Sequence, residues 1–190
     1  DEELREQLDI VNKIIATHQD TKYNKFCEIL RSLNWAGREQ DDRIVVFTER
    51  IETINYLKAN LEKDFKIKDK PIRSGDGEYP RIAVFQGGML DTEQDAMIEN
   101  FGKKDSPIRM LICSDAGAQG VNLHYYCNRM FNYDIPWSLI TLEQRNGRID
   151  RYKQPRVPYI HYLVLRSDNP NISTDFRILD RLKEKEDEVN

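Results

Sequence analysis

Along the chain from residue 44, short apolar runs alternate with segments in which apolar residues recur every three or four positions. The runs are typical of strands that are covered on both faces. They lie at 44–47, 82–85, 110–113, 129–133 and 159–165. The periodic segments predict amphipathic helices at 51–61, 91–101 and 138–151. This alternation predicts an α/β fold with a mostly parallel sheet and helices on both faces.

Helical patterns also flank the α/β region. Apolar residues recur at helical spacing over residues 1–35, and a polar connection follows at 34–42. The chain closes with a charged segment that we also expect to be helical. We therefore divide the chain into a helical flank at 1–40, an α/β lobe at 41–166 and a C-terminal helical extension at 167–190.

Three local patterns predict a loop and two helix N-termini. The charged segment 63–80 contains a Ser-Gly-Asp-Gly turn and is predicted to be an exposed loop. Thr48 is placed to cap the helix that follows the first strand. The sequence Asp-Thr-Glu-Gln at 91–94 has the form of a capping box.

The composition is that of a soluble globular protein, with 39% apolar and 33% charged residues in a chain of 190. No apolar run approaches the roughly 18 residues of a membrane span, so we expect no membrane partner and a cytoplasmic location. Cys27, Cys113 and Cys127 are widely spaced, which indicates a reducing compartment and no zinc or other metal site. The chain begins at Asp1 rather than Met, and we expect it to be a piece of a longer protein.

The net charge of −4 counts modestly against a broad basic surface for nucleic acid. It is compatible with a lobe that touches a few phosphates through backbone amides and helix N-termini.

The segment from Glu143 to Arg151 carries the most specific pattern. On a helix, Gln144, Arg148 and Arg151 would share one face because they are spaced by four and three. Two guanidinium groups on one face suit a polyphosphate, since each presents a planar fork of donors. The alternative is a solvated charged face on which these arginines pair with Glu143 or Asp150.

Three further segments follow predicted strands directly, and each could be an ordinary strand-to-helix connection without a binding role. The Gly-containing loop from Ser114 to Leu123 permits close backbone approach to a phosphate. The segments Val46–Arg50 and Phe85–Met89 offer amide donors where strands end. In a parallel sheet, ligands bind at the carboxyl ends of strands, so these segments should meet. Asp134 also follows a strand, and we expect it to be structural support rather than catalytic.

In their order, these segments resemble the C-terminal RecA-like lobe of superfamily 2 helicases, near the Swi/Snf-type translocases. The similar segments are Ile44–Arg50 (motif IV), Phe85–Met89 (motif IVa), Ser114–Leu123 (motif V) and Gln144–Arg151 (motif VI, Gln-x-x-Gly-Arg-x-x-Arg). Asn132–Trp137 is similar to bacterial members related to RNA-polymerase-associated ATPases. The resemblance covers about residues 40–166. Relatives often carry Asn-Pro where this chain has Ser138-Leu139, which alters how the next helix begins.

The resemblance implies ATP with Mg²⁺ as cofactor, held mainly by an upstream RecA-like lobe of the same polypeptide. This chain has no Gly-x-x-x-x-Gly-Lys-Ser/Thr sequence of its own. In the resemblance, Arg148 and Arg151 are the catalytic arginine fingers, and Gln144, Gly120 and Asn122 line the nucleotide cleft. Residues near the nucleic-acid backbone would be Thr48, Gly87, Ser114 and Asp115.

The implied partner is nucleic acid, with DNA favoured over RNA, and a transcription or DNA-maintenance complex is a further expected partner. Alone, the lobe would lack ATPase activity. Two other hypotheses stay open: a helicase-like interaction module without motor activity, and a phosphate-binding α/β domain of another class. A dinucleotide-binding domain is disfavoured because no Gly-x-Gly-x-x-Gly follows the first strand.

Overall fold

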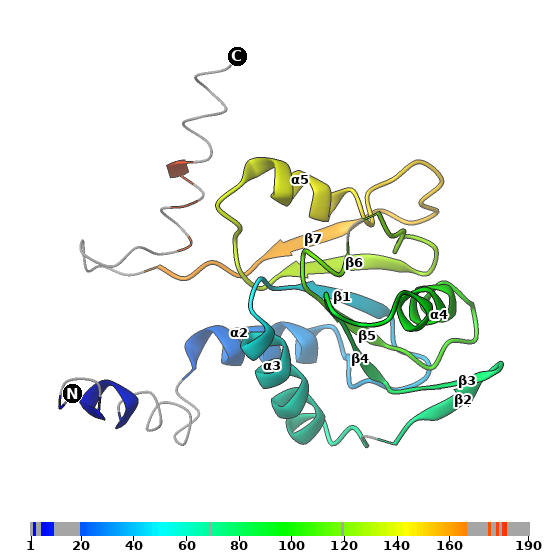
Figure 1. Ribbon diagram of the computed structural model, residues 1–190, viewed down its shortest axis with the longest axis horizontal. Coiled ribbons are helices and arrows are strands. Elements are labelled where there is room, and N and C mark those ends of the chain that lie inside the picture. Colours follow the sequence, from blue (N-terminus) through cyan, green and yellow to red (C-terminus); the bar gives the residue numbers. More distant parts are fainter. Residues whose placement is uncertain are drawn as a thin grey trace, which may run out of the picture.

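The structure is a computed structural model that describes residues 2, 5–9, 20–68, 70–118, 120–166, 175, 178, 180 and 181. At its centre is a five-stranded sheet in the order β4-β5-β1-β6-β7, and every neighbouring pair is parallel (Figure 1). The strands are β1 (Arg43–Phe47), β4 (Ile82–Phe85), β5 (Met110–Cys113), β6 (Cys127–Asn132) and β7 (Tyr159–Tyr162). Because they are parallel, the loops that follow them meet at one edge of the sheet.

Helices cover both faces of this sheet. They are α2 (Thr21–Ser32), α3 (Ile51–Asp64), α4 (Asp91–Phe101) and α5 (Leu139–Asn146). Alternate residues of β1 divide between the two faces: Ile44 and Val46 pack with side chains of α2 and α3, whereas Phe47 packs with Phe101 of α4. Figure 1 shows α2 and α3 together on one side of the strands and α5 on the other. The arrangement confirms the predicted RecA-like α/β fold.

The segment predicted to be an exposed loop at 63–80 contains a short antiparallel hairpin. Its strands are β2 (Ile72–Ser74) and β3 (Gly77–Tyr79), and the predicted turn joins them. The Asn100 side-chain amide on α4 donates to Ser74 Oγ (2.9 Å) and Ser106 Oγ donates to Asn100 Oδ1 (2.8 Å). A polar chain with a buried centre therefore fixes the hairpin to the lobe, which apolar periodicity does not reveal.

Both predicted side-chain caps were wrong. The N-cap of α3 is Arg50 and that of α4 is Leu90, and neither makes a side-chain cap hydrogen bond. Thr48 lies too early for capping, and its hydroxyl bonds elsewhere. Strand boundaries also differ from the prediction: β1 begins at Arg43, β6 spans Cys127–Asn132 and β7 ends at Tyr162.

The predicted flanks are described only in part. In the N-terminal flank, α2 confirms the second helical stretch and residues 5–9 are helical, while most of the first nineteen residues lie outside the described part. Most of the predicted extension at 167–190 also lies outside it. Of its described residues, Asp175 pairs with Lys22 of α2 (2.5 Å), and Ile178 packs with Ile135.

Within the described ranges, no helix is both long and apolar enough to cross a bilayer. The same ranges contain no group of three or more His, Cys, Asp and Glu side chains arranged to hold a metal ion. Cys27, Cys113 and Cys127 are buried free thiols, and burial raises the pKa of Cys127 to about 12.

Candidate functional site

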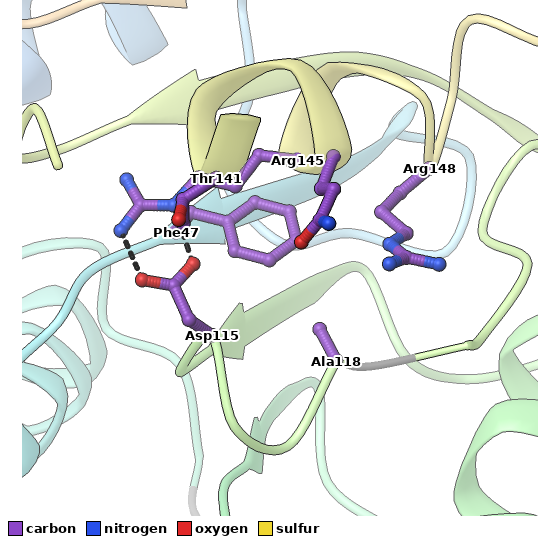
Figure 2. A pocket seen from close by; sticks show the side chains of 7 residues that line it. Phe47, Asp115, Ala118, Thr141, Arg145 and Arg148 are labelled. Carbon is purple, nitrogen blue, oxygen red and sulfur yellow. Dashed lines mark hydrogen bonds and ion pairs between the residues drawn. The ribbon is translucent and has the colours of Figure 1, made fainter. Parts of the chain in front are cut away.

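The loops that follow β1, β5 and β6 meet the last turn of α5 at the carboxyl edge of the sheet. Between them is a pocket of about 110 Å³ (Figure 2). Its lining residues are Phe47, Asp115, Ala118, Thr141, Gln144, Arg145 and Arg148. The pocket thus combines the ends of β1 and β5 with the segment that carries the arginine pattern.

Arg145 is the buried centre of this site, with 2% of its surface exposed. Its guanidinium forms a bidentate ion pair with Asp115, in which Nε donates to Oδ1 (2.6 Å) and Nη2 to Oδ2 (2.7 Å). Figure 2 shows the guanidinium directed at this carboxylate. The same group also contacts Oδ1 of Asp134 (3.3 Å) and lies 5.6 Å from the centre of the Phe47 ring. Such a fork-to-fork pair fixes both partners in orientation as well as in distance.

Asp134 extends the network to the end of β1. Its Oδ2 accepts hydrogen bonds from the Thr48 hydroxyl (2.5 Å) and from the backbone amide of Glu49 (2.8 Å). Its backbone carbonyl accepts from Arg145 Nη1 (2.9 Å). These contacts agree with the expected supporting role of Asp134.

The charges in this network do not cancel. Two carboxylates, those of Asp115 and Asp134, pair with the single guanidinium of Arg145, and the Glu49 carboxylate is influenced by the same charges. Burial lowers the pKa of Arg145, but its hydrogen bonds and charge attraction to Asp115 and Asp134 outweigh burial and raise that pKa. Burial raises the pKa of Glu49, and the neighbouring charge of Asp134 raises it further. The network therefore keeps Arg145 charged and occupied by carboxylates.

The predicted helix ends before the two arginines proposed as fingers. Gly147 is the C-cap of α5, so Gln144 is helical, whereas Arg148 lies in the turn that follows and Arg151 beyond it. The prediction that Gln144, Arg148 and Arg151 share one helical face was wrong. Gly147 marks the point at which the helix stops, which a spacing argument alone does not register.

Arg148 nevertheless reaches the pocket. Its side chain is partly exposed, and Nη1 donates one long hydrogen bond to the Val121 carbonyl (3.4 Å). Burial and the nearby charge of Arg151 lower the pKa of Arg148. Among the described residues, which include Glu143 and Asp150, no carboxylate forms an ion pair with Arg148 or Arg151. The solvated ion-pair alternative therefore finds no support in the geometry, and Arg148 is available for an anion.

The other residues expected to line a nucleotide cleft lie in two different places. Gln144 is exposed and lines the pocket with Arg148. Gly120 and Asn122 line a different groove of about 540 Å³, together with Ile98 of α4 and Tyr125. Gly120 has a φ of +76°, a conformation that favours glycine. Arg151 is exposed and lines neither.

The residues expected near nucleic acid also divide. Thr48 is fully buried, its amide donates to the Cys113 carbonyl (3.0 Å) and its hydroxyl donates to Asp134, so it has no donor free for a phosphate. Ser114 is buried beside exposed Gly87, whose amide donates to Ser114 Oγ (3.4 Å). The Asp115 carboxylate is paired with the Arg145 guanidinium.

Sequence reasoning singled out Arg148 and Arg151 and missed Arg145. The signal was present, because Arg145 stands three positions after the apolar Leu142, and both face inward on α5. A charged residue on the buried face of an amphipathic helix requires a partner, which Asp115 and Asp134 provide.

Comparison with known proteins agrees with this fold. Residues 21–153 match the model of the helicase conserved C-terminal domain, which is the greater part of the chain. The chain is 31% identical over 155 residues to the uncharacterized ATP-dependent helicase YqhH of Bacillus subtilis, covering 82% of this chain and 23% of that protein. It is 36% identical over 137 residues to the RNA polymerase-associated protein RapA of Vibrio cholerae, covering 67% and 13%. The chain thus spans less than a quarter of the length of either relative.

Solved structures share the fold at low identity. The C-terminal part of the Fun30 ATPase domain aligns with a TM-score of 0.57 at 14% identity, covering 86% of this chain and 54% of that one. Domain 2 of the DEAD-box helicase Mss116p, solved with an RNA duplex, aligns with a TM-score of 0.51 at 19% identity, covering 80% and 49%. The fold, the order of the motifs and the matched family model lead to one assignment: the chain belongs to the helicase conserved C-terminal domain family.

Proposed function

We propose that this chain is the second motor lobe of an ATP-dependent helicase or translocase and contributes an arginine finger to a nucleotide bound between two lobes. The observation that carries the proposal is Arg148, which lines a pocket at the carboxyl edge of the sheet and has one weak backbone contact. A guanidinium in this state can bind a γ-phosphate without first breaking an ion pair. Arg151, exposed nearby, is proposed as a second cation for the same triphosphate.

The other half of the nucleotide site would come from an upstream lobe. That lobe would hold the phosphates and Mg²⁺ through a P-loop, and Gln144 would face the nucleotide from this side. A finger stabilises the charge that develops on the transferred phosphoryl group, and it contributes roughly 10³–10⁵-fold to turnover in well-studied cases. This lobe alone would then hydrolyse ATP negligibly.

We assign the nucleic-acid contact to the loops after β4 and β5, where exposed Gly87 adjoins Ser114. Thr48 and Asp115 would act there only indirectly, because the network around Arg145 occupies their polar groups. The net charge of −4 is consistent with a narrow contact of this kind. We retain DNA as the proposed substrate, and a transcription or DNA-maintenance complex as the setting.

The test is an ATPase assay of the full protein and of this chain alone, each with single- and double-stranded DNA and RNA. The full protein should hydrolyse ATP, be stimulated most by DNA, and lose both properties when reduced to this chain. Turnover by this chain alone at the rate of the full protein would contradict a two-lobe site. A full protein that folds and binds partners without hydrolysing ATP would instead indicate a helicase-like interaction module.

A further inference from the structure

We propose that Arg145 is a positioning residue for ATP hydrolysis, which holds the loop after β5 and the end of α5 in the register that places Arg148 against the nucleotide. The inference rests on the function proposed above.

Arg145 cannot itself act as a phosphate ligand in this arrangement. It is 2% exposed, and each of its three guanidinium nitrogens donates to a carboxylate or carbonyl oxygen. Binding a phosphate would require breaking the bidentate pair with Asp115. Among the arginines of this motif, Arg145 is therefore committed to the protein and Arg148 is available.

The contacts of Arg145 join three neighbouring strands at their ends. Asp115 follows β5, the Phe47 ring ends β1, and Asn132 at the end of β6 accepts from Nη1 (3.4 Å). These strands are adjacent in the sheet, in the order β5-β1-β6. One side chain thus sets the relative positions of the loops that form the carboxyl edge.

The same two chain segments are tied together again at Arg148. Its backbone carbonyl accepts from the Leu123 amide (3.1 Å), and its guanidinium donates to the Val121 carbonyl. The loop that begins at Asp115 is therefore joined to the end of α5 at its start by Arg145 and at its far end by Arg148. Loss of the first tie would leave the loop joined to the end of α5 only at its far end, so the start of the loop and the Arg148 guanidinium could shift relative to each other.

A residue that only stabilises the fold would affect stability without affecting the chemical step selectively. A positioning residue should lower kcat while leaving the KM for ATP nearly unchanged, because the misplaced group acts mainly in the transition state. Misplacement by about 1 Å can lower turnover by around 100-fold.

The experiment measures kcat and KM for ATP of the full protein with saturating DNA, for Arg145→Gln, Arg145→Lys, Asp115→Asn and the double variant Arg145→Gln/Asp115→Asn. We expect Arg145→Gln to lose about 100-fold in kcat with KM within about threefold, and Arg145→Lys to recover part of the loss because it keeps the charge but not the fork. The double variant should be no slower than the slower single variant, because both remove one interaction.

The matched control is Arg156→Gln. Arg156 lies on the surface and pairs with a carboxylate that is far away in the sequence, that of Asp42 (2.8 Å). This substitution should leave both constants unchanged, and thermal unfolding should show which variants are folded. The proposal is overturned by a folded Arg145→Gln with kcat within about twofold of wild type, by losses that multiply in the double variant, or by a change in KM alone.

If Arg145→Gln does not fold, Asp115→Asn decides, since its volume is conserved and its side chain is 30% exposed. Normal kcat in folded Asp115→Asn overturns the proposal. Failure of the proposed function has a different signature, namely Arg148→Ala retaining normal turnover, whereas failure of the Arg145 proposal alone leaves the loss in Arg148→Ala intact.

Discussion

Gly117 shows how single residues set the carboxyl edge of the sheet. A Cβ atom at this position would lie 2.8 Å from Gln86 Cα and 2.9 Å from the Phe85 carbonyl oxygen. The loops after β4 and β5 therefore approach each other through backbone at this glycine. Sequence reasoning attributed the small residues of this loop to close approach of a phosphate, whereas at Gly117 the neighbour is the chain itself.

We predict that Gly117→Ala lowers the free energy of unfolding of the chain by about 1–3 kcal/mol, because backbone must shift to admit the methyl group. Gly87→Ala is the matched control, since its Cβ would meet only the Ala116 Cβ at 3.4 Å, an ordinary contact. Urea unfolding followed by circular dichroism measures both. Equal stability of the two variants would show that the loops are less closely packed than described.

Residue identity led to the prediction that motif VI binds phosphate, but it did not indicate which of its arginines lacks an ion pair. Arg145, Arg148 and Arg151 have the same chemistry in the sequence, and only burial and partners separate them. Those partners, Asp115 and Asp134, lie 30 and 11 positions away along the chain. The distribution of ion pairs depends on the folded arrangement, which local patterns do not contain.

Helix α5 is the element that connects packing to the site. Its N-cap is Ser138, whose hydroxyl accepts from the Thr141 amide (3.3 Å), and the helix buries Leu142 and Arg145. At Ser138, where the resemblance leads us to expect Asn, this chain also has a side chain that can cap the helix. The helix ends at Asn146, shorter than the predicted span of 138–151.

We predict that Ser138→Ala lowers the free energy of unfolding by about 1 kcal/mol, since it removes the acceptor that satisfies a first-turn amide. Ser138→Asp should retain most of the stability, because a carboxylate accepts the same hydrogen bond and is favoured at a helix N-terminus. Chemical denaturation of the chain measures the difference. An unchanged midpoint for Ser138→Ala would indicate that α5 is held by its buried residues alone.

At the level of elements, the sequence predicted all five strands of the main sheet and the helices between them. The apolar runs succeeded because burial on both faces leaves a continuous signal, as in β1 and β5. The apolar pattern did not predict the hairpin β2–β3. Its residues are half-buried or exposed, and polar contacts to Asn100 hold it in place. The predicted helix ends were wrong where the cap residues lack the usual side-chain cap or stop the helix early, namely at Arg50, Leu90 and Gly147.

At the scale of the whole molecule, the described residues form one layered lobe, and the candidate site lies at the carboxyl edge of its sheet. The candidate finger faces a pocket of only about 110 Å³, too small to enclose a nucleoside triphosphate. The proposed function therefore requires a second surface to complete the nucleotide site. Sequence reasoning reached the two-lobe hypothesis through motif order. Among the arginines of motif VI, the pocket lining supports Arg148 most strongly as the proposed finger.

The most direct test of that claim is kcat for DNA-stimulated ATP hydrolysis by the full protein carrying Arg148→Ala. We predict a loss on the order of 10³-fold, because the transition-state charge would lack its guanidinium, while thermal unfolding stays unchanged. Lys153→Gln, which removes a positive charge five positions further along the chain and outside the pocket lining, should retain wild-type turnover. A folded Arg148→Ala protein with near-normal kcat would contradict the account.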